Sequence, residues 1–217
     1  RGKYFVNLML NSCKTVCPDN EFTYKNECNV MGLEPGDASV KAHYDWIVAQ
    51  LERYTHDPDA AWIAITLHHQ PFIYPGQKSV LLPLLKKYKV EIIITGHEHW
   101  LDYSNMDYNY NIRYPTEEYG PVIVNCTDSE VFKTETREVD YYLGEKLHQF
   151  VVGSAGAIWW KSACPILDTD GDMLYRSTSL PGIMTMEVTY ELLTATYIYS
   201  DGTVGYIVRV HRSRNTQ

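Results

Sequence analysis

Residues 61–69 read AWIAITLHH, and residues 90–99 read VEIIITGHEH. Each stretch is a short apolar run, partly β-branched, that passes directly into histidines, which is typical of a buried strand followed by a polar loop. Apolar side chains recur at helical spacing before both runs, in residues 40–54 and again in residues 79–88. The alternation of helix and strand predicts an α/β fold with the histidines at the carboxyl ends of strands, where open α/β sheets bind ligands.

The pattern extends outward in both directions. Residues 4–10 (YFVNLML) predict a further strand, and Asp37 is a candidate N-cap for the helix of residues 40–54. At the other end, residues 182–188, 193–200 and 203–210 alternate apolar and polar side chains, with a Ser-Asp-Gly-Thr turn at residues 200–203. The chain is therefore expected to end in an antiparallel meander.

Residues 102–147 differ from the rest of the sequence. They are rich in Tyr, Asn, Asp and Glu, and only residues 121–126 (PVIVNC) read as a strand. We expect this Tyr-rich segment to be a surface insertion, either a lid over the site or a surface for a protein partner.

Composition limits the classes of protein. The chain has 217 residues, 45% hydrophobic and 21% charged, which fits one folded domain over residues 1–217. The net charge of −8 argues against nucleic acid as a partner. Every apolar run is far shorter than the ~20 residues that cross a bilayer, so no transmembrane segment is expected in this chain.

Cysteines and one sequon favour the secretory pathway, in a secreted, lysosomal or cell-surface protein. Cys17 and Cys28 bracket a polar loop that suits a disulfide bridge, because no second Cys or His pair lies nearby at zinc spacing. The chain has five cysteines, so at least one is left over. Asn125 begins an Asn-Cys-Thr acceptor sequence for N-glycosylation.

The histidines are the strongest chemical feature. His97 and His99 are separated by one residue after a glycine, and His69 follows the neighbouring strand, so all three can face one cavity. Neutral imidazole is a good ligand for Zn, Fe, Mn or Cu. His68 is either a residue supporting its neighbour or one that faces substrate. The alternative is that each histidine is an ordinary core or surface residue with one hydrogen bond.

Two motifs resemble those of the calcineurin-like metallophosphoesterases. Residues 67–72 (LHHQPF) are similar to an HxP element, and residues 96–99 (GHEH) to the GHxH element of that family. The sequence is most similar to purple acid phosphatases of the small, tartrate-resistant type, and the likeness covers most of the chain. It implies the C-terminal part of a four-layer αββα sandwich.

The resemblance also implies a chemistry. Purple acid phosphatases hold a ferric ion and a divalent Fe, Zn or Mn, and they hydrolyse phosphomonoesters. By motif position, His69 and His97 would bind the divalent ion and His99 the ferric ion. Two such ions, ~3.5–4 Å apart, clamp a phosphate and lower the pKa of a water. Lys78 follows the HxP element and either meets the phosphate or is a solvated surface lysine.

The upstream GD and GNH motifs of that family are absent from this sequence. Asp37 follows a glycine, but it heads a helix, so we do not expect it to be a ligand. Truncation is favoured, with the missing N-terminal half of the domain as a partner of this chain. The alternatives are an inactive phosphatase-like domain that serves as a structural or binding component of a larger assembly, and a phosphodiesterase or nucleotidase of the same superfamily.

Overall fold

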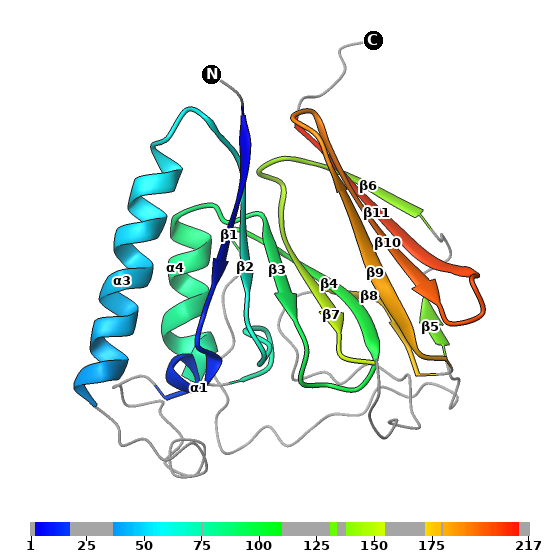
Figure 1. Cartoon of the computed structure of the whole chain (residues 1–217), viewed down its shortest axis with the longest axis horizontal. Helices are drawn as coiled ribbons and strands as arrows, with labels where there is room; N and C mark the ends of the chain where they lie inside the picture. Colours follow the sequence, from blue (N-terminus) through cyan, green and yellow to red (C-terminus); the bar gives the residue numbers. More distant parts are fainter. Residues whose placement is uncertain are drawn as a thin grey trace.

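Three layers make up the described part of the protein, as Figure 1 shows: helices, a seven-stranded sheet and a four-stranded sheet. The coordinates are a computed structural model that describes residues 3–17, 37–74, 76–109, 131–133, 138–154, 172–178 and 180–212. The predicted α/β class is confirmed, and the two packed sheets fit part of an αββα sandwich. In the described residues, helices cover one sheet only.

The larger sheet carries the parallel core of the fold. Strands β1, β2, β3 and β7 pair in parallel, and β4, β8 and β5 continue the sheet in antiparallel pairs. The order across the sheet is β1 (Tyr4–Met9), β2 (Ala60–Thr66), β3 (Ile92–Thr95), β7 (Lys146–Val152), β4 (Leu101–Asp107), β8 (Asp172–Ser177) and β5 (Val131–Lys133). The apolar runs of residues 61–67 and 90–95 therefore form neighbouring parallel strands that end at the same edge of the sheet.

Two helical segments cover this sheet as the periodicity predicts. Helix α3 (Ala38–Thr55) begins at Asp37, whose side chain accepts the Ser39 amide at 2.7 Å, and it buries Val40, Ile47 and Leu51. The predicted helix of residues 79–88 divides into a π-helical turn, η1 (Gln77–Leu81), and α4 (Leu82–Lys87). Pro83 lies in the first turn of α4, where its missing N–H costs nothing. A short helix, α1 (Ser12–Thr15), was not predicted.

The smaller sheet confirms the predicted meander. Its order is β6 (Glu138–Tyr142), β11 (Val204–His211), β10 (Leu192–Tyr199) and β9 (Gly182–Val188). The turn between β10 and β11 places Gly202 at φ +85°, which glycine adopts without strain. The face between the two sheets is filled largely by aromatic residues, namely Trp62, Tyr103, Phe150, Tyr175, Tyr197 and Tyr206. Among the described residues, no helix has the length and apolar character needed to cross a membrane.

The structure revises the predicted insertion at both of its ends. Residues 101–107 form β4, a buried strand in the larger sheet, and β7 begins at Lys146. Composition misled here because two polar side chains of β4 find partners inside the fold: Asp102 pairs with Arg176, and the Asn105 side-chain nitrogen donates to Tyr141. Residues 110–130, including the predicted strand at 121–126 and Asn125, lie outside the described residues.

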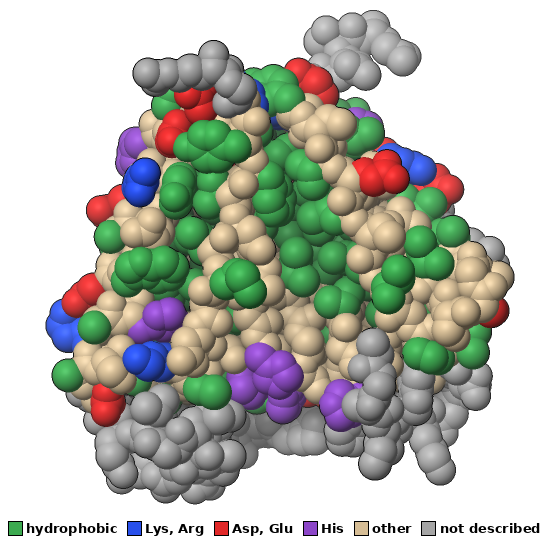
Figure 2. Space-filling view, viewed as in Figure 1, with side chains coloured by type: hydrophobic (Ala, Val, Ile, Leu, Met, Phe, Trp, Pro, Cys, Tyr) green, Lys and Arg blue, Asp and Glu red, His purple; other side chains and the backbone are tan. Residues whose placement is uncertain are grey.

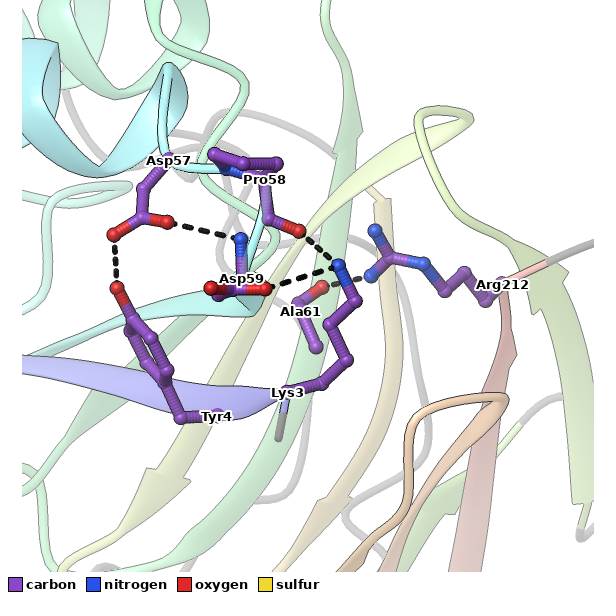
Figure 3. Close-up of polar contacts among 7 residues, drawn as sticks. All are labelled: Lys3, Tyr4, Asp57, Pro58, Asp59, Ala61 and Arg212. Atoms are coloured by element: carbon purple, nitrogen blue, oxygen red, sulfur yellow. Dashed lines mark hydrogen bonds and ion pairs between the residues drawn. The ribbon is translucent and has the colours of Figure 1, made fainter. Parts of the chain in front are cut away.

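The start of β1 is fastened to the turn between α3 and β2 (Figure 3). The Tyr4 hydroxyl donates to the Asp57 carboxylate, and this bond raises the pKa of Tyr4 to about 12. Arg212, just beyond β11, donates to the Ala61 carbonyl of β2. This last contact joins the end of the smaller sheet to the larger one.

Candidate metal centre

Three histidines meet where β2 and β3 end. His68 and His69 follow β2, and His97 follows β3 after Gly96. One ring nitrogen from each histidine lies within 4.8 Å of the other two. We call these three residues the histidine cluster. Figure 2 shows histidine side chains together at the end of the molecule to which β2 and β3 point in Figure 1.

The backbone after β3 bends sharply to bring His97 to its neighbours. His97 has φ 40°, in the left-handed region that only a few per cent of residues other than glycine adopt. Its Nδ1 lies 2.9 Å from Nε2 of His68, so the two rings share a hydrogen bond. The ring centroids of His97 and His69 are 4.6 Å apart. Such backbone strain is often found at ligand sites.

His69 is held from the other side by α1. It is 4% exposed, and its Nδ1 lies 3.0 Å from the Ser12 hydroxyl oxygen. Asn11 caps α1 by accepting the Cys13 amide, which fixes the position of Ser12 at the start of the helix. With Nδ1 engaged by Ser12, Nε2 is the nitrogen of His69 that is available to a metal ion.

All three rings are neutral near neutral pH. Burial lowers the pKa of His69 to about 4, with smaller contributions from His97 and His68. Burial also lowers the pKa of His68 and His97, and neighbouring imidazoles lower it further. Neutral imidazole is the form that binds metal, so the cluster does not need to lose protons before it binds an ion at pH 7.

His99, the third predicted ligand, is not one of the three clustered residues. It lies near them, because its charge contributes to the lowered pKa of both His68 and His97. His68, which the sequence left as either a supporting or a substrate-facing residue, is the third member of the cluster. The predicted metal roles of His69, His97 and His99 stay predictions. The signal for His68 was its position immediately before His69, at the point where the chain turns out of β2.

Lys78 is not a surface residue. It lies on η1 with 3% of its surface exposed, and its backbone amide donates to the Tyr74 carbonyl at 2.9 Å. The alternative of a solvated lysine is therefore wrong, and its predicted contact with phosphate stays a prediction. Tyr74 itself packs edge-on against His69, with ring centroids 4.9 Å apart. Sequence reasoning gave no role to Tyr74 or to Ser12.

The structure describes two of the five cysteines, Cys13 and Cys17. Cys13 carries a free thiol beside Ser12, and Cys17 is completely buried. The remaining cysteines, Cys28, Cys126 and Cys164, lie outside the described residues, as does the predicted glycosylation site. The bridge from Cys17 to Cys28 stays a prediction.

The donor set fits a first-row transition metal. Three neutral nitrogen ligands on adjacent loops suit Zn, Fe, Mn or Cu, whereas Mg and Ca prefer oxygen. Within the described residues, the group that could hold an ion contains no carboxylate. A bridging Asp between two metal ions would therefore have to come from elsewhere.

Comparison with known proteins identifies the fold through structure alone. No protein-family profile matches the sequence, and no curated protein matches it. The purple acid phosphatase PPD1 from yellow lupin (Lupinus luteus) seeds aligns with a TM-score of 0.50 and 18% identity, over 85% of this chain and 30% of that one. GAP50, named as the anchor in the inner membrane complex of Plasmodium, aligns with a TM-score of 0.58 and 13% identity, over 98% of this chain and 50% of that one.

Both solved chains are much longer than the part that this protein matches. The chain spans half of one and 30% of the other. Both alignments have TM-scores of 0.50 or above at identities below 20%, which is a likeness of fold. This chain therefore has the calcineurin-like fold of the purple acid phosphatases, over a part of that fold's length.

Proposed function

We propose that this chain supplies part of the active site of a metal-dependent phosphatase that acts on phosphomonoesters. The histidine cluster carries the proposal, because three neutral imidazole nitrogens lie within 4.8 Å at the strand ends of a purple acid phosphatase fold. In this assignment His69 and His97 hold a divalent Fe, Zn or Mn ion, and His99 reaches a ferric ion.

The chemistry follows from these positions. Metal ions at such a site act as Lewis acids on phosphoryl oxygens and make hydroxide available near neutral pH. His68 is the exposed member of the cluster and shares a hydrogen bond with His97, so it faces the solvent side from which a phosphoester approaches. Lys78 adds positive charge behind the HxP turn. The predicted secretory location suits an enzyme of this kind.

The rest of the site would come from a polypeptide segment that completes the sheets. Among the described strands, β1 and β9 lie at sheet edges, and hydrophobic side chains gather in the hollow between the two sheets in Figure 2. Met9 is 74% exposed on β1, and Ile183 is 58% exposed on β9. A folded protein rarely leaves two unpaired sheet edges and the apolar surface between them exposed to solvent. The missing carboxylate ligands would arrive with the segment that covers them.

A second candidate is an inactive domain that serves as an anchor. GAP50 favours it, because GAP50 is named as an anchor and covers nearly all of this chain. In that case the histidine cluster would be a remnant, and the surface of the domain would be the functional part.

The test measures metal binding and hydrolysis together. The complete protein is titrated with Co²⁺, followed by absorption spectroscopy, and assayed with p-nitrophenyl phosphate. The phosphatase proposal expects Co²⁺ binding and metal-dependent hydrolysis, both lost in His97→Ala. His211→Ala, on the smaller sheet, is the control and keeps both.

The outcomes separate the candidates. Binding without hydrolysis of p-nitrophenyl phosphate, but with hydrolysis of bis-p-nitrophenyl phosphate, would indicate a phosphodiesterase. Absence of hydrolysis with either substrate would favour the anchor. Failure of the complete protein to bind Co²⁺, or full activity in His97→Ala, would remove the cluster from the active site.

A further inference from the structure

A buried ion pair lies directly behind the loop that carries His97 and His99. Arg176 on β8 and Asp102 on β4 have side chains that are each 2% exposed. Nε and one terminal nitrogen of Arg176 both lie 2.8 Å from one Asp102 oxygen. The other Asp102 oxygen accepts from Ser104 at 2.8 Å. The pair is therefore well satisfied, which a buried charge requires.

Two residues that follow the GHEH segment, Trp100 and Asp102, contact this arginine. The Arg176 guanidinium lies over the Trp100 ring, 4.1 Å from its centroid, and Asp102 pairs with it two residues later. Glu98 lies close enough for the charge of Arg176 to oppose the rise in its pKa that burial causes. Trp100 and Asp102 thus both contact one cation, and His97, a few residues before them in the same loop, belongs to the histidine cluster.

The arginine is itself rigidly placed. Arg176 is paired with Asp102 in the ladder between β4 and β8, and the Asp102 carbonyl accepts the Tyr197 hydroxyl from the smaller sheet. The GHEH backbone also rests on Gly153, where a Cβ atom would lie 2.1 Å from the Glu98 carbonyl oxygen. The loop therefore packs closely against the end of β7, and Arg176 contacts the residues that follow it.

We propose that Arg176 is a positioning residue for the metal loop, because it holds Trp100 and Asp102, which directly follow His99, and so fixes the loop that carries His97 and His99. The metal-binding part of this inference rests on the proposed function. The ordering of the loop does not, and it can be measured without metal.

The experiment removes both charges at once, because a single unpaired buried charge would destabilise the whole protein. Arg176→Met with Asp102→Leu is compared with Arg209→Met with Glu138→Leu, a control that deletes the 2.8 Å surface pair between β11 and β6. Urea unfolding establishes that each variant is folded. Hydrogen exchange of residues 96–101 and of β2 is then measured in the complete protein, followed by Co²⁺ titration.

We expect exchange in residues 96–101 to become at least about tenfold faster in the Arg176 double variant, with β2 unchanged, and Co²⁺ affinity to fall by about 10–100-fold. Arg176→Lys keeps the charge but lacks the planar group over Trp100, so it should lie between the wild type and the double variant. The control pair should change neither measurement.

Unchanged exchange in residues 96–101 in a folded variant would overturn the proposal. Unchanged Co²⁺ affinity alongside faster exchange would remove the metal-positioning part of it. If the wild type binds no Co²⁺, the proposed function fails, and exchange alone decides the role of Arg176. If the double variant does not fold, Arg176→Lys is judged by the same two measurements.

Discussion

At the scale of single residues, the histidine cluster depends on a serine from a distant part of the chain. Ser12 lies 57 positions before His69, yet its hydroxyl meets His69 Nδ1 at 3.0 Å in a buried contact. A hydrogen bond to one ring nitrogen occupies that nitrogen and fixes how the ring is turned. Ser12 therefore selects Nε2 of His69 as the metal-binding atom.

Ser12→Ala should weaken metal binding without unfolding the protein. Loss of a partner that orients a ligand typically lowers metal affinity by about 10–100-fold. The measurements are Co²⁺ titration and the ¹⁵N shifts of His69, which report its tautomer. Ser12→Thr keeps the hydroxyl and is expected to restore both, whereas a wild-type affinity in Ser12→Ala would show that Ser12 does not orient His69.

At the scale of elements, α3 illustrates how a helix is defined at its start. Its first turn contains no acidic residue, so the Asp37 side chain supplies the local negative group and accepts the Ser39 amide. A hydrogen bond from the Ser39 side chain lowers the pKa of Asp37, and the bond from the Ser39 amide lowers it further. The Tyr44 hydroxyl on the same helix donates to the Thr15 carbonyl at 2.9 Å, so α3 also braces α1.

Asp37→Ala should lower the free energy of unfolding by about 1 kcal/mol, because the Ser39 amide in the first turn of the helix loses its acceptor. Asp45→Ala on the same helix is the matched control. It removes an exposed ion pair with Lys41 and should cost no more than about 0.5 kcal/mol. Urea unfolding of the two variants measures the difference, and equal losses would argue against a capping role for Asp37.

At the scale of the whole molecule, two buried groups set opposite dependences of stability on pH. Burial raises the pKa of Glu91 to about 7, although its carboxylate accepts the Ile63 amide at 2.8 Å. Complete burial lowers the pKa of His148 to about 3, and its Nδ1 lies 2.8 Å from the Tyr103 hydroxyl.

The signs follow from which state binds more protons. Between its ordinary pKa of 4.5 and about 7, Glu91 is more protonated in the folded state, so stability falls as pH rises. Between about 3 and 6.5, His148 is more protonated in the unfolded state, so stability rises with pH. His69, with a pKa of about 4, acts in the same direction as His148.

Glu91→Gln should therefore steepen the rise of stability with pH. Between pH 4.5 and 6.5 the variant loses the opposing contribution, and its slope should exceed that of the wild type by up to about 1.4 kcal/mol per pH unit. Urea unfolding at several pH values in this range is the measurement, with the exposed Glu187→Gln as control. Parallel curves for wild type and Glu91→Gln would contradict the assignment.

Local patterns in the sequence were sufficient for the elements that bury one face. Helix α3, strands β2 and β3 and the closing meander were all predicted, because helical or alternating apolar spacing shows directly which side chains are buried. The position of His69 and His97 at strand ends follows from the same patterns. These local patterns are therefore enough to predict the fold class and the edge of the sheet where the histidines lie.

The remaining features of the site depend on contacts between residues that are far apart in the sequence. β4 has no simple apolar pattern, and its burial depends on Arg176, which follows Asp102 by 74 positions. Ser12 is likewise distant in sequence from His69, and His97, which bonds to His68, has a left-handed backbone conformation. A polar residue can be buried only if it meets a partner, and strand order, which local spacing does not encode, decides which partners meet.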